Sequence, residues 1–448
     1  MKIIIAGAYS IGTHLSKLLS RSKETITLVD DDDERLAKIG ADFDLLTYEG
    51  SPSSLKVLRD VGADDADLFI AVTPDQSLNV NSCILARALG AKKTVAQIDN
   101  DEYTEPETVE FFNHLGVNSL VYPEQLAATD IINGLKMSWV RQRWDVHGGA
   151  LVMLGIKMHA GSEILGQPLK DICGPDDPYH VVGIKRPTGD TVIPGGNDTL
   201  ENGDMAYFMT TKPFIPYLRR LVGKEHYVDV KNVMVMGGGK TAVKAVNAMP
   251  SYMDVKVIEQ NPARAEALND LIDPDKAMVI LGDGRDVQLL NEEGIRYTQA
   301  FVALTSNAET NILACLTAKR LGVRKTVAMV ENLDYVNMAE SLDIGTIINK
   351  KAIAAGHIYQ LMFDADVFNV RSLLTANSDV AEFIAREGSK ITEKAVKDLR
   401  LPPNITIGGL VRAGEGLLVS GNTRIQAGDS VMVFCQSQNL KKIEKLFL

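Results

Sequence analysis

The sequence contains few cysteines, and they are widely spaced. The four in 448 residues are Cys83, Cys173, Cys315 and Cys435, and no two of them form a C-x-x-C pair. This spacing excludes a disulfide framework and a cysteine-based zinc site, and it favours a reducing compartment. The seven histidines show no H-x-x-x-H or H-x-E spacing, so no metal site is expected.

Long apolar runs and an excess of positive charge are also missing. No apolar stretch reaches the roughly 18 residues needed to cross a bilayer, and no basic segment followed by an apolar one opens the sequence. The formal net charge of −11 disfavours binding to nucleic acid and direct adsorption to anionic lipid. We therefore expect a cytoplasmic chain that binds no nucleic acid, does not insert into a membrane, and is peripheral to one only through a protein partner.

Two glycine-rich turns follow short apolar runs. The first is Gly7-Ala8-Tyr9-Ser10-Ile11-Gly12 and the second is Gly237-Gly238-Gly239-Lys240-Thr241-Ala242. In a strand–turn–helix unit, such glycines let the backbone approach a pyrophosphate at the helix N-terminus. The second turn fits G-x-G-x-x-G/A, whereas Tyr9 stands where the first turn would have its second glycine. The Tyr9 side chain either fills the space through which a phosphate would approach or swings out to flank the ligand. A purely structural alternative is that each turn only connects a strand to a helix.

A carboxylate ends the next expected strand in both copies. Asp30 follows Gly7 by 23 residues, and Glu259 follows Gly237 by 22. At this position a carboxylate accepts hydrogen bonds from ribose hydroxyls and repels a 2′-phosphate, which favours NAD(H) or an adenine mononucleotide over NADP(H). For Asp30 the alternative is a solvated acidic turn, because three more aspartates follow it and one of them is able to cap the next helix.

Other candidate residues lie at the ends of expected strands. Thr73 and Thr305 end a fourth strand, and Gly282-Asp283-Gly284 follows a third. Ligands of open α/β sheets bind at this carboxyl edge. Each threonine either contacts a phosphate or ribose or only caps the next helix, and the same alternatives apply to Asn79 and Asn311.

The two halves of the chain match well beyond the turns. Gly7 and Gly237 lie 230 residues apart, and Gly90 and Gly322 lie 232 apart in similar segments. So constant a spacing indicates a tandem duplication. Within each half, strands alternating with helices predict a doubly wound, Rossmann-like parallel sheet, followed by a strand-rich segment that predicts a small α+β domain. We expect an α/β protein of A-B-A-B order, with domain limits at 1–140, 146–227, 230–363 and 366–448.

No catalytic constellation is evident. The sequence has no G-x-S-x-G motif and no candidate acid or base beside a substrate domain. Cys83 and Cys315 occupy equivalent positions on apolar helix faces, where core packing is expected. An NAD-dependent oxidoreductase, the alternative from the enzyme class, needs a proton-transfer residue near the nicotinamide. We therefore expect a protein that binds nucleotides and is not an enzyme.

With these features the chain resembles the TrkA family, the cytosolic regulatory subunits of Trk potassium-uptake systems. The resemblance rests on the domain order, the glycine turns, the strand-end acids, the Gly-Asp-Gly segment, and motifs such as those at 304–311 and 123–126. It implies RCK-N (TrkA-N) and RCK-C (TrkA-C) domains in a homo-oligomeric gating ring, a dimer or tetramer, under a TrkH-type or TrkG-type membrane subunit. It also implies binding of NAD(H) and of ATP or ADP. A sensor serving another cation transporter is a further alternative.

Carried over by position, the resemblance implies two ligand sites. The first comprises Gly7, Ala8, Tyr9, Ser10, Ile11, Gly12, Asp30 and Thr73. The second comprises Gly237, Gly239, Lys240, Thr241, Glu259, Asp283 and Thr305.

Overall fold

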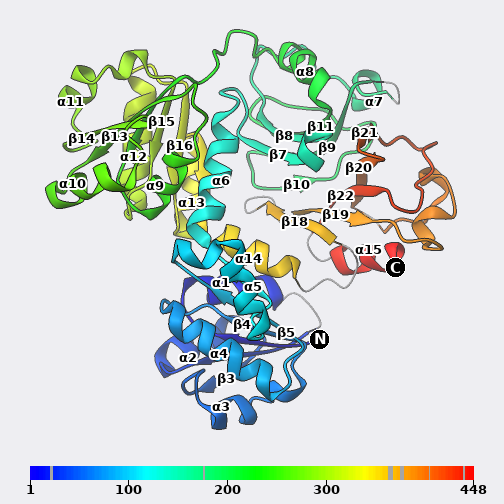
Figure 1. The fold of residues 1–448 in the computed structure, drawn as a ribbon. Helices are drawn as coiled ribbons and strands as arrows, with labels where there is room; N and C mark the ends of the chain where they lie inside the picture. The colour runs from blue at the N-terminus through cyan, green and yellow to red at the C-terminus, as the bar shows by residue number, and fades with distance from the viewer. Residues whose placement is uncertain (21–23, 175–176, 362–366, 374–377, 403, 437–438) are drawn as a thin grey trace. The chain divides into compact units, whose positions relative to one another are not determined.

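The structure, a computed structural model, describes residues 1–20, 24–174, 177–361, 367–373, 378–402, 404–436 and 439–448 (Figure 1). In chain order it contains a six-stranded parallel sheet, a five-stranded antiparallel sheet, a second six-stranded parallel sheet and a second five-stranded antiparallel sheet. This confirms the expected fold class and its alternating order. The limits expected at 363 and 366 lie outside the described residues. The chain divides into two compact units, one of which combines Met1–Leu126 with the segment that begins at Lys350.

The parallel sheet of the first unit has the strand order β3-β2-β1-β4-β5-β6. Its strands are β1 (Lys2–Ala6), β2 (Thr25–Asp30), β3 (Leu46–Glu49), β4 (Leu68–Ala71), β5 (Lys93–Gln97) and β6 (Ser119–Val121). The central strand β1 is apolar from Ile3 to Ala6 and its isoleucines are fully buried, as expected for a strand covered by helices on both faces. The strand order reverses between β1 and β4, and the carboxyl ends of these strands are where a doubly wound sheet binds its ligand.

In the described part of the chain, six helices accompany this sheet, and one of them comes from the second half of the sequence. Five follow the strands: α1 (Ser10–Leu19), α2 (Asp33–Asp42), α3 (Leu55–Asp60), α4 (Gln76–Leu89) and α5 (Pro106–His114). The sixth, α14 (Lys350–Gln360), packs against α1. Its buried face is rich in alanine and glycine, which allows close helix approach. Lys350 also lies 2.8 Å from Glu124, at the start of α6 (Pro123–Leu135).

The parallel sheet of the second unit repeats the same order, β14-β13-β12-β15-β16-β17. Its strands are β12 (Asn232–Met236), β13 (Asp254–Glu259), β14 (Ala277–Leu281), β15 (Ala300–Ala303), β16 (Lys325–Met329) and β17 (Thr346–Ile348). The helices between them are α9 (Lys240–Asn247), α10 (Pro262–Leu271), α11 (Val287–Glu292), α12 (Ala308–Arg320) and α13 (Leu333–Ser341). The tandem repeat of the sequence is therefore a repeat of topology.

The antiparallel sheets repeat each other too, in the orders β10-β9-β11-β8-β7 and β21-β20-β22-β19-β18. The first contains β7 (Gln142–Val146), β8 (Leu151–Lys157), β9 (Tyr179–Lys185), β10 (Thr191–Val192) and β11 (Met205–Thr210). The second contains β18 (Val367–Leu373), β19 (Ser378–Ile384), β20 (Ile405–Arg412), β21 (Glu415–Leu418) and β22 (Ser430–Gln436). Each sheet buries one aspartate in an ion pair with an arginine, Asp204 with Arg186 and Asp429 with Arg412.

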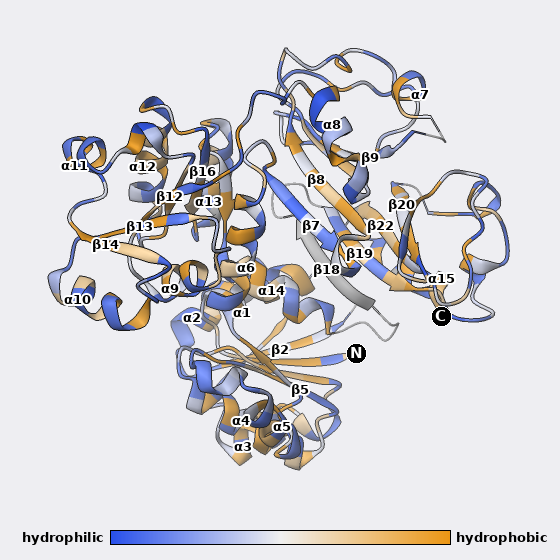
Figure 2. Ribbon diagram, turned by 45° about the horizontal axis from the view of Figure 1, so that its top comes forward, coloured by the Kyte–Doolittle hydropathy of each residue, from blue (hydrophilic) through white to orange (hydrophobic). Residues whose placement is uncertain are grey.

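The two antiparallel sheets share one hydrophobic core. Residues from β7, β8, β9 and β11 pack with residues from β19, β20 and β22 in a single buried cluster. The rings of Tyr207 and Phe434 lie 5.6 Å apart, and a side-chain carbon at Gly183 would come within 2.4 Å of the Phe434 ring. Figure 2 shows apolar residues along β8 and β22. In the described part of the chain, no helix has both the length and the apolar composition that crossing a bilayer requires.

Candidate nucleotide sites

The first glycine turn depends on two glycines. Gly7 directly follows β1 and has a φ of +112°, a conformation that residues with a side chain rarely adopt. A side-chain carbon there would lie 2.9 Å from the backbone nitrogen of Thr73, at the end of β4. At Gly12 such a carbon would lie only 1.9 Å from the Gly7 carbonyl oxygen. These contacts bring the ends of β1 and β4 together with the first turn of α1.

Asp30 lies directly against this turn. Its side chain is buried, and its Oδ2 accepts a hydrogen bond of 2.6 Å from the backbone N–H of Ala8. Its Oδ1 accepts another, of 3.0 Å, from the backbone N–H of Asp32. The solvated-turn alternative therefore does not hold for Asp30, although the Asp32 side chain does cap α2 by accepting from the N–H of Arg35.

Arg35, which the sequence patterns do not single out, lies beside Asp30 and Tyr9. From the first turn of α2, its Nη2 donates a 2.9 Å hydrogen bond to Asp30 Oδ1. Its guanidinium carbon lies 4.1 Å from the centre of the Tyr9 ring, and a cation so close to an aromatic face is attracted to it. Tyr9 thus lies against Arg35. In the sequence, the feature that indicates this contact is an arginine in the first turn of the helix that follows the strand-end acid.

The second turn has the same backbone geometry, but glycine replaces the side chains of Ala8 and Tyr9. Gly237 has a φ of +97°. Glu259, which is buried, accepts through Oε2 from the N–H of Gly238 and through Oε1 from the N–H of Asn261, both at 2.8 Å. A side-chain carbon at Gly238 would meet Leu268 at 2.3 Å, whereas one at Gly239 would meet nothing within 4 Å. The space beside the second turn is therefore open where Tyr9 stands in the first.

The helices that leave the two turns begin without a side-chain cap. Neither Tyr9 nor Gly239, the residues that precede α1 and α9, caps its helix through a side chain. By contrast, α2, α3, α4, α10, α11 and α12 are all capped by an aspartate, asparagine or serine. The N–H groups at the start of α1 and α9 therefore remain as donors for an anion, which the helix dipole also favours.

The first turns of these helices contain the remaining predicted residues of each motif. Ser10 and Lys240 are exposed, and each occupies the first position of its helix. Ile11 and Thr241 are buried. A phosphate at either turn would therefore meet backbone N–H groups before it met the side chains of these two buried residues.

Thr73 and Thr305 are held by asparagines of the following helix. The Thr73 hydroxyl lies 2.7 Å from Asn79 Oδ1, and Asn79 Nδ2 donates to the Thr73 carbonyl at 2.9 Å. Thr305 and Asn311 show the same two distances. Because both threonines are engaged in these internal bonds, the geometry favours a structural role at the strand end.

Asp283 lies at the same edge of the second sheet. The N–H of the preceding Gly282 donates to the Glu259 carbonyl at 2.9 Å. The Asp283 carboxylate pairs with Arg285 at 2.7 Å, and this hydrogen bond lowers the pKa of Asp283. Asp283 is thus beside Glu259 through the backbone, while its own side chain faces Arg285.

Cys83 and Cys315 lie in the two cores, as predicted. Both are fully buried, and their thiols lie 3.3 and 3.5 Å from the carbonyl oxygens of Val95 and Val327. Burial raises the pKa of both thiols, that of Cys315 to about 12. A protonated, buried thiol is a poor nucleophile.

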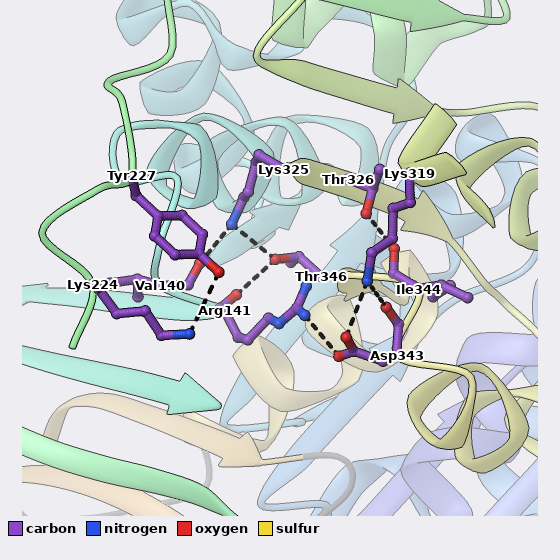
Figure 3. A network of polar contacts seen from close by, with 10 residues as sticks. All are labelled: Val140, Arg141, Lys224, Tyr227, Lys319, Lys325, Thr326, Asp343, Ile344 and Thr346. Carbon is purple, nitrogen blue, oxygen red and sulfur yellow. Dashed lines mark hydrogen bonds and ion pairs between the residues drawn. The ribbon is translucent and has the colours of Figure 1, made fainter. Parts of the chain in front are cut away.

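Within the second unit, a buried polar network joins the segment after α6 to the parallel sheet (Figure 3). Lys325, on β16, donates to the Val140 carbonyl at 2.6 Å and to the Thr346 hydroxyl at 3.1 Å. The Thr346 hydroxyl in turn donates to the Arg141 carbonyl at 2.9 Å. Lys325 is almost completely buried, and burial lowers its pKa well below the ordinary value.

An ion-pair triad extends this network. Asp343, between α13 and β17, lies 2.7 Å from Arg141 and 3.0 Å from Lys319 on α12. Although burial alone would raise it, these cations hold the pKa of Asp343 below its ordinary value. The start of β7 is thereby anchored to the helices and strands of the second parallel sheet.

The sequence matches two family models. The TrkA-N domain matches residues 3–123 and 233–350, and the TrkA-C domain matches residues 380–448. The Trk system potassium uptake protein TrkA of Haemophilus influenzae is 30% identical over 457 residues, covering 100% of this chain and 98% of the relative. A TrkA homolog of Archaeoglobus fulgidus is 28% identical over 448 residues and covers 100% of both chains.

Solved structures with the same fold include two forms of GsuK. The GsuK RCK domain superposes with a TM-score of 0.59 at 17% identity, covering 100% of this chain and 94% of that one. The GsuK channel bound to NAD gives 0.58 at 17% identity and covers 100% of this chain and 78% of that one. At this identity the likeness is one of fold.

Proposed function

Since the chain belongs to the TrkA family, we propose that it is a nucleotide-sensing regulatory subunit of a Trk-type potassium-uptake system. Its two glycine turns bind NAD(H), and ATP or ADP compete for the same sites. A homo-oligomer of the chain controls a TrkH-type or TrkG-type membrane subunit from the cytoplasmic side. Binding, and not turnover of the nucleotide, is the activity.

The observation that supports this proposal is the contact between a carboxylate and a glycine turn, which occurs in both copies. In both copies a buried strand-end carboxylate accepts a hydrogen bond from the N–H of the residue after the first glycine, Ala8 or Gly238. The carboxylate is therefore fixed beside an uncapped helix N-terminus. An adenosine ribose on the carboxylate and a phosphate on the helix N–H groups would satisfy both at once. We assign the first site to residues 7–12 with Asp30 and the second to residues 237–241 with Glu259.

The first site is also connected to a helix from the second copy. α1 begins at the turn and packs along α14. A phosphate bound at the N-terminus of α1 therefore acts on a helix whose buried face supports α14. Because α14 precedes the second antiparallel sheet in the chain, a displacement of α14 is a route from ligand to the rest of the protein.

Small energies at many sites are sufficient for such control. A ligand shifts an equilibrium only through its different affinities for the two states. Moving a two-state ring from 1:99 to 99:1 takes about 5.5 kcal/mol, or roughly 0.7 kcal/mol for each of eight equivalent sites in a four-chain ring. A duplicated site in an oligomer is thus suited to a steep switch.

Isothermal titration with NADH tests the proposal. The wild-type chain is expected to bind NADH saturably, and the Asp30→Asn/Glu259→Gln double variant is expected to lose that binding. The exposed acids Asp33 and Glu266 provide matched controls, since Asp33→Asn and Glu266→Gln should leave binding unchanged. Oxidation of the NADH in the presence of small carbonyl compounds would instead support an oxidoreductase, and absence of binding by NADH, ATP and ADP would contradict the proposal.

A further inference from the structure

The two carboxylates that face the glycine turns differ in how many hydrogen bonds they already accept. An ionised carboxylate offers about four acceptor positions, two on each oxygen. Asp30 Oδ1 accepts from the N–H of Asp32 and from Nη2 and Nε of Arg35, at 3.0, 2.9 and 3.3 Å. Its Oδ2 accepts from Ala8. One oxygen of Asp30 is therefore saturated, and the other has one position left.

Among the described residues, each oxygen of Glu259 accepts one hydrogen bond, which leaves one acceptor position on each. Oε1 accepts from Asn261 and Oε2 from Gly238. The residue equivalent to Arg35 is Arg264, in the first turn of α10, whose backbone N–H donates to Asn261. Its side chain is exposed, and among the described residues no hydrogen bond or ion pair joins it to Glu259. The same residue type at the same helix position thus acts on the carboxylate in only one copy.

Arg35 is held firmly where it is. Besides Asp30, its guanidinium pairs with Asp32 at 3.1 Å and with Asp31 at 3.5 Å, and it lies over the Tyr9 ring. To donate a hydrogen bond to Asp30 Oδ1, a ribose hydroxyl would have to displace the Arg35 guanidinium, which is paired with three carboxylates. Tyr9 also stands where Gly239 leaves the second turn open.

We propose that Arg35 sets a difference in affinity between the two sites, so that the second site is the tight site for NAD(H) and the first is the weak one. This inference rests on the proposed function. A ribose diol has two O–H donors, and it can donate one to each oxygen of Glu259 but only one to Asp30. One hydrogen bond to a charged group corresponds to about tenfold to hundredfold in affinity, which is the difference expected between the sites.

Titration of single-site backgrounds with NADH tests the inference. The Glu259→Gln chain reports the first site alone, and the Asp30→Asn chain reports the second. In the Glu259→Gln background, Arg35→Met removes the guanidinium donors and leaves Asp30 with two backbone donors, as Glu259 has. We expect this change to tighten NADH binding by about tenfold or more. Arg264→Met in the Asp30→Asn background is the matched control and should change the dissociation constant by less than about twofold, because no hydrogen bond or ion pair among the described residues joins Arg264 to Glu259.

Arg35→Gln, which keeps a polar side chain without a charge, is a second variant in case the methionine disturbs folding. It should also tighten the first site. Weaker or unchanged binding in both variants would overturn the inference, and so would equal affinities of the two single-site backgrounds. Those results would leave NADH binding itself intact, whereas a wild-type chain that binds no NADH would overturn the proposed function as well.

Discussion

Replacing Lys224 with methionine should stabilise the protein at neutral pH. Lys224 follows α8 (Ile215–Leu221) and is buried, and its Nζ lies 3.5 Å from the Tyr227 hydroxyl and 4.9 Å from the centre of that ring. Burial and repulsion by Arg141 lower the pKa of Lys224 from 10.5 to about 8, while Asp343 opposes the shift. A charge is therefore buried beside the network of Figure 3 with little to compensate it.

The shift in pKa gives the size of the effect. Each pKa unit corresponds to about 1.4 kcal/mol, so keeping Lys224 charged in the folded protein costs about 3 kcal/mol at pH 7. Its contact with the face of Tyr227 returns about 0.5–2 kcal/mol. Since methionine removes both contributions, we expect Lys224→Met to raise the free energy of unfolding by about 1–3 kcal/mol at pH 7.

The lowered pKa of Lys224 also makes the stability depend on pH. Below pH 8, Lys224 is protonated in both the folded and the unfolded states, and the full cost is present. Between about pH 8 and pH 10.5 the folded state loses this proton first, so this contribution to stability rises with pH in the wild-type chain. The advantage of the variant should therefore shrink as the pH increases through this window.

Urea unfolding followed by tryptophan fluorescence measures this difference. The two tryptophans, Trp139 and Trp144, are buried on either side of Arg141 in the chain, so the signal reports on the relevant region. Lys170→Met, at an exposed position, is the control and should change stability by less than about 0.5 kcal/mol. A destabilised Lys224→Met chain at pH 7, or an advantage that does not shrink toward pH 10, would contradict a net cost of burying the Lys224 charge.

Three further changes have defined outcomes. Gly12→Ala places a carbon 1.9 Å from the Gly7 carbonyl oxygen and should lower the free energy of unfolding by about 1–3 kcal/mol, seen as a lower melting temperature. An unchanged melting temperature would contradict the tight contact between α1 and the glycine turn. Asp429→Asn leaves the partly exposed Arg412 beside a neutral amide and should cost about 1–3 kcal/mol in urea unfolding. A cost below about 0.5 kcal/mol would contradict the assigned burial of Asp429. Asn311→Ala removes the hydrogen bonds that Asn311 makes to Thr305 and to the Met329 carbonyl, and it should speed amide hydrogen exchange at the end of β15. Unchanged exchange would contradict the structural role of Asn311.

Local patterns were sufficient to predict the parallel sheets and the two turns. Gly7 and Gly237 needed only a strand before them and a helix after them, and both adopt the left-handed backbone conformation that favours glycine. Asp30 and Glu259 followed from their spacing to the turns. These features depend on residues close in sequence, or on one repeated unit, so their chemistry is visible in a single chain.

Contacts between distant segments were not predictable in this way. The packing of α14 on α1 joins residues more than 300 positions apart, and the small residues of α14 are equally suited to other helix contacts. The shared core of the antiparallel sheets depends on shape complementarity, as at Gly183 and Phe434. Arg35 has a counterpart at Arg264, and only the side-chain conformations show that one arginine reaches its carboxylate and the other does not.

Control of potassium transport by nucleotide binding to this chain is the proposed function, and a rubidium flux assay measures it. A TrkH-type membrane subunit would be reconstituted in liposomes with the wild-type chain or with the Asp30→Asn/Glu259→Gln variant, and flux would be measured with and without NADH. We expect flux to depend on NADH only with the wild-type chain. A nucleotide effect that persists with the double variant, or one that is absent with a wild-type chain shown to bind both NADH and the membrane subunit, would contradict the proposed function.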